Sequence, residues 1–221
     1  MQPTPSRFTM PSPAQARPGV DLVALGADLQ PGTLLAAYRS GLFPMPVDPE
    51  RKRSKIAWYS PDPRGVLPLD GLKISKSLRR SQRRYHVTMN TAFEQVMWAC
   101  ADPRREGRWI TPEFVQSYTD MFELGWAHSF EVWDDEGELV GGAYGLRIDA
   151  FFAGEAMFHT ATDASKVALV ELVDWLNSTG AELLDVQWAT PHLESLGVIE
   201  IARSDYLRRL GSATAGFPSQ L

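Results

Sequence analysis

The chain has 221 residues, of which 44% are hydrophobic and 22% are charged, and its net charge at pH 7 is −5. This composition fits a soluble globular protein with its own core and argues against a general nucleic-acid binder, because phosphate contacts need Lys and Arg. A single cysteine, Cys100, excludes an internal disulfide and a cysteine-based metal site, which fits the reducing cytoplasm.

The first part of the chain predicts a lead-in followed by a small domain. Residues 1–18 carry five prolines and predict a flexible, extended segment without the apolar run of a signal peptide, so export is not expected. No apolar run reaches the length of a membrane span. The small domain is expected over residues 19–70, where Pro31 begins a helix that Gly41 ends.

A larger second domain is expected over residues 71–210, followed by a weakly patterned tail at 211–221. Its helices are predicted to begin near Thr91 and at Thr111-Pro112, where a hydroxyl cap precedes proline, and a third follows at 164–176. Its strands are predicted at residues 129–133, 139–148, 150–158 and 183–188. Antiparallel strands, then a helix, then another strand predict an α+β sheet with helices on its faces.

Several common catalytic signatures are absent from the sequence. It has no G-x-x-x-x-G-K-[ST] loop for nucleotide phosphates and no G-x-S-x-G nucleophile turn. The four histidines, His86, His128, His159 and His192, are scattered and never paired at a zinc-ligand spacing. We therefore interpret them as ordinary histidines and expect no metal site.

Positive charge is concentrated in one short run of this acidic chain. Residues 73–84 contain no acid and six basic residues: Lys73, Lys76, Arg79, Arg80, Arg83 and Arg84. Such a concentration is what a phosphate-contacting patch requires. The alternative is a solvated helix face without a partner.

A glutamate lies in the middle of the apolar strand predicted near residues 150–158. Burying its carboxylate is costly unless it meets a cation or several donors, which makes Glu155 a candidate site residue. Gly154 leaves room for the close approach of a ligand. Alternation predicts one face with Phe151, Ala153 and Glu155, and an opposite face with Phe152, Gly154, Ala156 and Phe158. The alternative is an edge strand with Glu155 in water.

The last predicted strand carries Asp185 and Gln187 among apolar residues. Alternation places both side chains on one face, where their acceptor oxygens can hold an amine. The alternative is a structural hydrogen-bonded pair, since buried polar groups usually pair.

Many ordered motifs carry a resemblance to a known family. They are LGADL (25–29), AYRSGLFP (37–44), WYSPDPR (58–64), WIT (109–111), GWAHS (125–129), EVW (131–133), LVGGAYG (139–145), GEAMF (154–158), ASK (164–166), DVQ (185–187) and SLG (195–197). From about residue 25 to 207, the chain resembles the bacterial leucyl/phenylalanyl-tRNA–protein transferases. It departs from their usual pattern at Ala27, Met45, Ala156 and His159-Thr160, where Gly, Trp, Ser and Ser-Arg are common.

The resemblance implies a fold, a reaction and its substrates. The fold is a small N-terminal α/β domain and a larger acetyltransferase-like (GNAT-type) domain with a mixed sheet flanked by helices. The reaction moves Leu or Phe, and less readily Met, from aminoacyl-tRNA to a protein that begins with Arg or Lys, which marks the product for degradation by the N-end rule pathway. It implies no ATP or metal cofactor and no membrane, and nothing in the sequence demands an oligomer, so a monomer is expected.

The resemblance also implies roles for individual residues. Its apolar pocket and nucleotide platform correspond to Trp58, Trp109, Phe152, Leu172 and Leu176, and we expect Gly154 and Met157 to line the same pocket. Leu172 and Leu176 stand where relatives often have Phe. The polar site residues of the family match Glu155, Asp185 and Gln187. The basic run at 73–84 would hold the acceptor stem of the tRNA by contacting the sugar–phosphate backbone of the RNA.

Our hypothesis from the sequence gives Asp185, oriented with Gln187, the task of holding and partly deprotonating the incoming amine. Glu155 would engage the amino group of the donor or the basic end of the acceptor.

Three other functions compete with this one. An acetyl-CoA-dependent N-acetyltransferase would need an Arg/Gln-x-x-Gly-x-Gly turn at a helix start, which is absent. A cell-wall peptide transferase that uses aminoacyl-tRNA is typically longer, with a doubled domain. A non-enzymatic tRNA-binding module would not need Asp185 and Gln187 together on an apolar strand.

Overall fold

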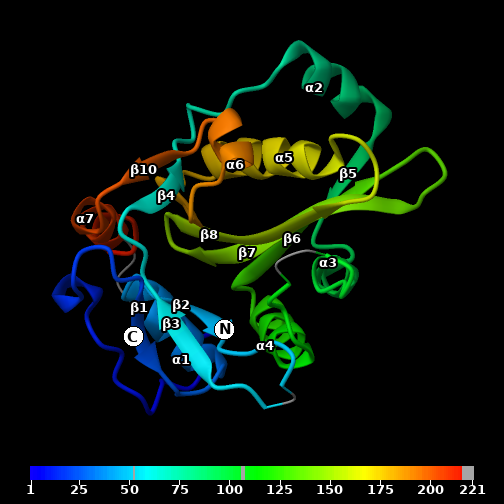
Figure 1. The fold of residues 1–221 in the computed structure, drawn as a ribbon. Coiled ribbons are helices and arrows are strands. Elements are labelled where there is room, and N and C mark those ends of the chain that lie inside the picture. Colours follow the sequence, from blue (N-terminus) through cyan, green and yellow to red (C-terminus); the bar gives the residue numbers. More distant parts are fainter. Residues whose placement is uncertain (52, 106–107, 216–221) are drawn as a thin grey trace.

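The computed structural model describes residues 1–51, 53–105 and 108–215, and they form one small and one large sheet (Figure 1). The small antiparallel sheet has the order β1-β3-β2, with β1 at Leu22–Leu25, β2 at Phe43–Pro46 and β3 at Ile56–Tyr59. Helix α1 (Pro31–Arg39) begins at its proline and is followed by Gly41, which takes a φ of 84° that favours glycine. The predicted first helix is therefore confirmed.

The large sheet has seven strands in the order β10-β4-β9-β8-β7-β6-β5. Their bounds are β4 Arg64–Leu67, β5 His86–Met89, β6 Ala127–Trp133, β7 Leu139–Ile148, β8 Phe151–His159, β9 Leu183–Gln187 and β10 Ile199–Ile201. All neighbours are antiparallel except β8 and β9, so the sheet is mixed. The α+β class with a mixed sheet flanked by helices is confirmed.

Helices cover both faces of the large sheet (Figure 1). Helix α5 (Ala164–Ser178) packs on β6, β7 and β8 from one side, and α3 (Phe93–Cys100) and α4 (Pro112–Glu123) pack from the other. The shorter helical segments are η1 Pro13–Gln15, α2 Lys76–Ser81, η2 Gln82–Arg84 and α6 Pro191–Ser195, and α7 covers Arg203–Ala213. Thr111 precedes α4 as predicted but makes no side-chain capping bond.

Strands β8 and β9 separate soon after they begin. They are paired in parallel only from Phe151 opposite Leu183 to Ala153 opposite Asp185, although β8 continues to His159. Because paired strands lie about 4.8 Å apart, the gap that opens beyond this point can admit other groups.

A β-bulge lies in each of these two strands. Against β7, Gly154 pairs with Gly145 and Ala156 with Tyr144, so Glu155 is an extra residue in β8. Against β4, Asp185 pairs with Val66 and Gln187 with Gly65, so Val186 is an extra residue in β9. The bulges thus coincide with the polar residues of both strands.

The bulge at Glu155 corrects part of the predicted alternation. Ala156 and Phe158 were expected on the face of Phe152, but they pack in the opposite layer with Phe151. One extra residue reverses the inward and outward faces of everything that follows it in a strand.

Two domain boundaries fall differently from a simple division of the sequence. Strand β4 precedes residue 70 but belongs to the large sheet, so the predicted boundary falls after the first strand of that sheet. Helix α7 extends to Ala213, into the predicted tail, and residues 216–221 lie outside the described residues.

The lead-in at residues 1–18 lies against the rest of the protein. The guanidinium of Arg203 on α7 donates to the carbonyls of Pro13, Arg17 and Val20 at 3.3–3.5 Å. The predicted flexible segment therefore has defined contacts in the structure.

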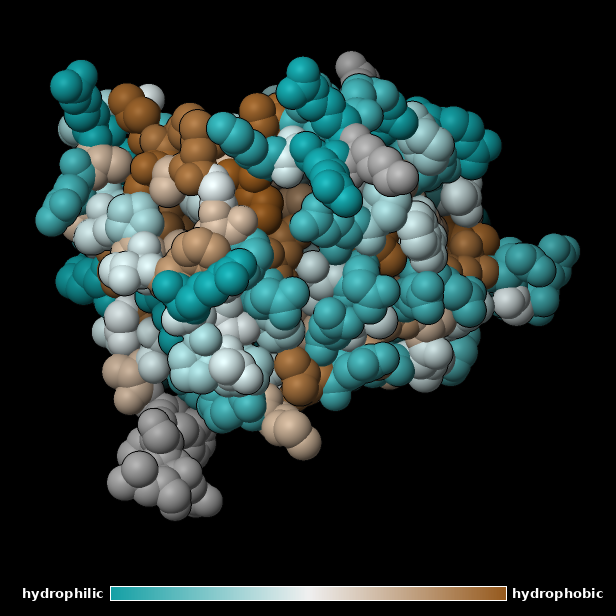
Figure 2. Space-filling view, turned by 90° about the horizontal axis from the view of Figure 1, so that it is seen from below, coloured by the Kyte–Doolittle hydropathy of each residue, from teal (hydrophilic) through white to brown (hydrophobic). Residues whose placement is uncertain are grey.

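One hydrophobic core joins the two domains. It contains Leu34 and Trp58 from the first domain together with Phe114 and Phe151 from the second. Seen from below, much of the surface is hydrophilic, with the larger group of hydrophobic residues at the upper left and smaller ones elsewhere (Figure 2). Among the described residues, no helix combines the length and the hydrophobicity needed to cross a membrane.

Candidate functional site

Two cavities meet beside the gap between β8 and β9. We call them the inner cavity, of about 180 Å³, and the outer cavity, of about 260 Å³. Both are lined by Glu155, Val186, Gln187 and Leu193, so the bulge residues lie where one cavity passes into the other. This arrangement can bring two different ligand groups together at Glu155 and Gln187.

The inner cavity has a mostly aliphatic wall, to which Tyr144, Glu155 and Gln187 add polar groups. Its lining includes Leu67, Met157, Leu169, Leu172 and Leu184. Such a wall suits an apolar side chain, because apolar groups gain about 25 cal/mol for each Å² removed from water.

The outer cavity has an aromatic wall. Phe43, Trp109 and Trp188 line it, and the Phe43 and Trp188 rings meet edge to face with centroids 4.9 Å apart. Aromatic faces of this kind stack on planar groups such as nucleobases.

Glu155 presents one bound and one unbound carboxylate oxygen at this junction. Its Oε2 accepts a hydrogen bond from the Tyr118 hydroxyl at 3.0 Å, and Tyr118 is in turn hydrogen-bonded to Tyr38. Its buried Oε1 has no partner among the described residues. Burial raises the pKa of Glu155 from 4.5 to about 7, against the opposing effect of the Tyr38 and Tyr118 hydroxyls. Glu155 can therefore exchange a proton near neutral pH.

Gln187 is held in an unusual backbone conformation next to Glu155. It is 8% exposed with a φ of 61°, and its backbone N–H donates to Asp185 Oδ1 at 2.9 Å. Its side-chain Nε2 is buried and has no partner among the described residues. An amide donor and a carboxylate acceptor thus border the same space with hydrogen-bonding capacity unused.

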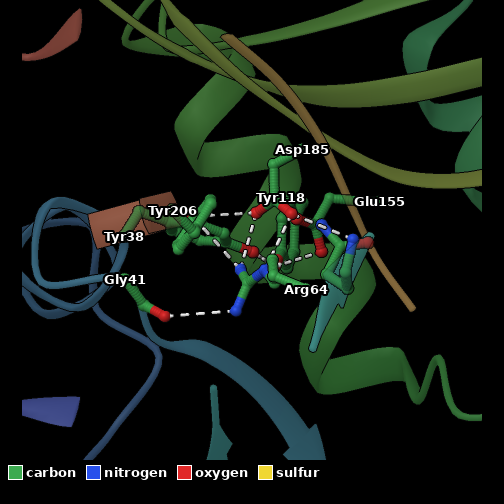
Figure 3. Close-up of polar contacts among 8 residues, drawn as sticks. Tyr38, Gly41, Arg64, Tyr118, Glu155, Asp185 and Tyr206 are labelled. Carbon is green, nitrogen blue, oxygen red and sulfur yellow. Dashed lines mark hydrogen bonds and ion pairs between the residues drawn. The ribbon is translucent and has the colours of Figure 1, made fainter. Parts of the chain in front are cut away.

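Asp185 is fully buried and its carboxylate is saturated (Figure 3). Oδ1 accepts from Arg64 Nε at 2.8 Å and from the Gln187 N–H, and Oδ2 accepts from Arg64 Nη2 at 2.6 Å and from the Tyr206 hydroxyl at 3.0 Å. These four bonds fill the roughly four acceptor positions of a carboxylate. Asp185 lines neither cavity, so the predicted shared face with Gln187 does not occur, because the bulge at Val186 separates the two side chains.

Arg64 connects this carboxylate to the first domain. It is 0% exposed, lies over the rings of Phe43 and Tyr206, and donates through Nη1 to the Gly41 carbonyl at 3.3 Å. Burial lowers the pKa of Arg64, but the Asp185 carboxylate and the Tyr206 hydroxyl outweigh that effect and hold it above its usual value. Arg64 is therefore a permanent cation paired with Asp185.

Sequence reasoning missed Arg64, Tyr38, Tyr118 and Tyr206 as site residues. Two of them carried a signal, because Arg64 ends the WYSPDPR motif and Tyr38 lies within AYRSGLFP. Nothing in the sequence indicated which acid Arg64 would meet.

The seven predicted pocket residues fall into two groups. Gly154, Met157 and Leu172 line the inner cavity and Trp109 lines the outer one. Trp58, Phe152 and Leu176 belong to the hydrophobic core and line neither cavity. The Trp58 indole N–H donates to the Gly26 carbonyl at 2.8 Å, which accounts for its polar atom.

The basic run forms α2, η2 and the segment before them. All six basic residues, Lys73, Lys76, Arg79, Arg80, Arg83 and Arg84, are exposed, and none forms a salt bridge with a described residue. Ser81 donates to Asp163 at 2.9 Å and Tyr85 to the Thr162 carbonyl at 2.8 Å, which ties the run to the start of α5 (Figure 1). The cations are thus available to an anionic partner.

No metal-ligand cluster is found in the ranges 1–51, 53–105 and 108–215, where no three or more His, Cys, Asp or Glu side chains could hold an ion.

Comparisons with known proteins give consistent matches. The model of the leucyl/phenylalanyl-tRNA protein transferase family matches residues 66–211, and that of its N-terminal domain matches residues 27–62. A leucyl/phenylalanyl-tRNA–protein transferase of Tolumonas auensis is 47% identical over 97% of this chain and 92% of its own length. One of Anaeromyxobacter dehalogenans is 46% identical over 95% of this chain and 89% of its own. Among solved structures, a GCN5-related N-acetyltransferase of Kribbella flavida aligns with a TM-score of 0.43 at 12% identity, over 78% of this chain and 61% of that one.

Proposed function

The chain belongs to the leucyl/phenylalanyl-tRNA–protein transferase family, and we propose that it transfers leucine or phenylalanine from aminoacyl-tRNA to the α-amine of a protein. The observation that carries this proposal is the junction of the two cavities. There, Glu155 Oε1 and Gln187 Nε2 have unused hydrogen-bonding capacity between an aliphatic and an aromatic wall.

The two cavities and the basic run offer one place for each part of the donor. The Leu or Phe side chain enters the inner cavity, and the terminal adenosine of the tRNA stacks in the outer cavity beside Trp109. The acceptor stem lies along the basic run at 73–84, whose cations contact the phosphates without reading sequence.

The reaction needs no energy source beyond the donor ester. The acceptor amine attacks the ester carbonyl, the new C–N bond forms, the C–O bond to the tRNA ribose breaks, and the proton released by the amine ends on the ribose oxygen. About a tenth of an α-amine with a pKa near 8 is already neutral at pH 7. Positioning of the two reactants can contribute about 7–11 kcal/mol to the rate enhancement.

Glu155 and Gln187 are the groups that we propose contact the reacting amine. Glu155 accepts a hydrogen bond from the amine, and takes up its proton as the C–N bond forms, while the Gln187 amide orients the substrate carbonyl. Asp185 has no acceptor position left for an amine, so its proposed role is to hold the Gln187 backbone and to pair with Arg64. This revises the role that the sequence gave to Asp185.

Finer aspects of the function extend this proposal. We propose that the acceptors begin with Arg or Lys, that Met is transferred less readily, and that the product enters the N-end rule degradation pathway. We propose that the reaction occurs in the cytoplasm, without ATP or a metal ion, and that the enzyme acts as a monomer.

The direct test incubates radiolabelled Leu-tRNA and Phe-tRNA with a peptide that begins with Arg. Transfer of label to the peptide is expected, and an N-acetylated copy of the peptide should receive none because its amine is blocked. A peptide that begins with Ala tests the acceptor preference. No label on any free amine would refute the proposed reaction.

The shape of the inner cavity is tested with other charged tRNAs. Branching at the β carbon should be excluded, and one misplaced methyl group is worth about 1–3 kcal/mol, so Ile-tRNA should react roughly 10–200 times more slowly than Leu-tRNA. Equal rates for the two donors would contradict the proposed pocket.

The basic run is tested by changing Arg79, Arg80, Arg83 and Arg84 to Gln. Weaker tRNA binding is expected, and the slope of log K against log salt should fall by about 1 for each phosphate that the variant no longer neutralises. The matched control changes four other exposed arginines, Arg17, Arg53, Arg208 and Arg209, to Gln. Equal effects of both sets would mean that only net charge matters.

A further inference from the structure

We infer that Tyr118, itself held by Tyr38, is a positioning residue for Glu155: it fixes one carboxylate oxygen so that the other faces the reacting amine. This inference rests on the proposed function in one respect, because the reacting amine is assigned there. Its geometric content concerns only the three side chains (Figure 3).

The three side chains come from three separate elements. Tyr38 lies on α1 of the first domain, Tyr118 on α4 and Glu155 on β8. An ionised carboxylate only accepts hydrogen bonds, so the single hydroxyl proton of Tyr118 goes to Glu155 Oε2. The Tyr118 oxygen then accepts the proton of Tyr38, which gives the chain one direction.

The hydrogen bonds from Tyr38 to Tyr118 and from Tyr118 to Glu155 compensate for the freedom that the bulge gives the Glu155 side chain. An extra residue in a strand has no partner opposite it in the ladder, so the neighbouring strand does not fix its side chain. Tyr38 is 1% and Tyr118 0% exposed, so both hydroxyls are held in packed surroundings away from bulk water. The carboxylate is therefore oriented from outside its own sheet.

The hydroxyl pair is more than a way to satisfy two buried tyrosines. The nearby Tyr144 hydroxyl is buried without a partner among the described residues, and its ring packs edge to face with Tyr118. Tyr144 also lines the inner cavity, so it differs from Tyr38 and Tyr118, which line neither cavity. Tyr38 donates to Tyr118, and Tyr118 in turn needs Glu155 as the acceptor for its own proton.

These hydrogen bonds also affect the pKa of Glu155. A hydrogen bond donated to a carboxylate favours its ionised form, so the loss of the Tyr118 hydroxyl should raise the pKa of Glu155 further. The other titratable groups that act on this carboxylate are Arg64 on β4, Asp185 on β9, Tyr144 on β7 and Tyr206 on α7. None of these is changed by a substitution at Tyr118.

The first measurement is an NMR titration of the free protein with ¹³C-labelled glutamate carboxyls. The Glu155 signal is assigned by its absence in Glu155→Gln. Tyr118→Phe should raise the titration midpoint by about one pH unit, because it removes a hydrogen bond that favours the ionised carboxylate. Tyr38→Phe should also raise it, because the Tyr38 hydroxyl favours the ionised form of Glu155 and holds Tyr118.

A double variant and one control variant test the contact that runs from Tyr38 through Tyr118 to Glu155. Tyr38→Phe combined with Tyr118→Phe should shift the midpoint by less than the sum of the two single shifts, because the two hydroxyls are hydrogen-bonded to each other. Tyr206→Phe removes a buried hydroxyl that contacts Asp185 and not Glu155, so it should move the Glu155 midpoint by much less than Tyr118→Phe. An unmoved midpoint in Tyr118→Phe, or additive shifts in the double variant, would overturn the inference while leaving the proposed reaction untouched.

The second measurement is the pH dependence of transfer from Leu-tRNA. In Tyr118→Phe the rising limb of kcat should move to higher pH by the NMR shift, with about a tenfold loss of kcat at pH 6 and an unchanged KM for the tRNA. An NMR shift without a shifted rate profile would overturn the positioning role. An absence of transfer in the wild-type protein would instead refute the proposed function. The NMR titration would still show whether Tyr118 orients Glu155 and affects its pKa.

Discussion

The two acids of the site lie on neighbouring strands and have opposite surroundings. Asp185 on β9 is fully buried, and four hydrogen bonds occupy both of its oxygens. Glu155 on β8 receives one hydrogen bond and keeps Oε1 unbound beside two cavities. From this difference we propose that Asp185 builds the site and that Glu155 acts in it, since only an acceptor with free capacity can take a substrate proton.

The two acids also differ in how their negative charges are compensated. Asp185 is neutralised by Arg64, which contacts it through both Nε and Nη2. Glu155 pairs with no cation among the described residues and depends on two hydroxyls. A permanent ion pair gives rigidity, whereas a carboxylate with a pKa of about 7 can change its charge during a reaction.

The largest expected effect comes from removing the cation that pairs with Asp185. Arg64→Met leaves a buried carboxylate without its cation, which should lower the free energy of unfolding by about 3–5 kcal/mol. Urea denaturation measures the change. Arg208→Met, which breaks the exposed pair with Asp205, is the control and should cost no more than about 1 kcal/mol. Similar losses in both variants would contradict the special role of the buried pair.

The second prediction concerns the effect of Glu155 on stability as pH changes. Its pKa is raised in the folded state, from 4.5 to about 7, so the folded protein binds this proton more tightly than the unfolded chain. Stability from this group is therefore lost as pH rises from about 4.5 to 7, by an amount on the order of 3 kcal/mol. Urea denaturation of wild type and Glu155→Gln at pH 5 and pH 8 should show the variant gaining relative stability at pH 8. A constant difference would disprove the raised pKa.

The third prediction concerns the rate at the Glu155 side. Glu155→Gln keeps the shape of the side chain but cannot take a proton, so transfer should slow by about 100-fold, the range for general acid–base groups. Single-turnover transfer from Leu-tRNA to an Arg peptide measures it. The control is Glu136→Gln, in an exposed turn between β6 and β7. A loss in Glu155→Gln no greater than in this control would remove Glu155 from the chemistry.

The smallest expected effect comes from removing one of the neutral donors to Asp185. Tyr206→Phe removes one of four donors and leaves both Arg64 contacts in place, so unfolding should become easier by about 1–2 kcal/mol. Urea denaturation measures it beside Arg64→Met. A loss as large as that of Arg64→Met would show that the hydroxyl, and not the cation, carries the stability of Asp185.

The sequence predicted the local part of this fold well. Helix α1, the strands β6 to β9 and helix α5 follow from apolar periodicity and from proline or glycine at their ends. The short strands β1 to β5 and β10 were missed, because three or four residues are too few to show an alternation. Their places are set by partners distant in the chain, such as β6 and β4.

The site was predicted only in part, for a physical reason that the two bulges make plain. A single extra residue, Glu155 or Val186, changes which side chains face the gap, and no local pattern announces it. The partner of Asp185 is 121 residues away in sequence. Trp58 was assigned to the pocket because it lies in a family motif, yet its indole is packed in the core with the Gly26 carbonyl.

The shared hydrophobic core has a consequence for how the molecule melts. Leu34 and Trp58 of the first domain pack in the same cluster as Phe114 and Phe151 of the second, and Arg64 reaches the Gly41 carbonyl across the boundary. Neither part can lose its packing without exposing apolar surface of the other. The two domains should therefore unfold in one cooperative calorimetric transition, with equal van't Hoff and calorimetric enthalpies. The small and the large sheet would then melt as a single cooperative unit.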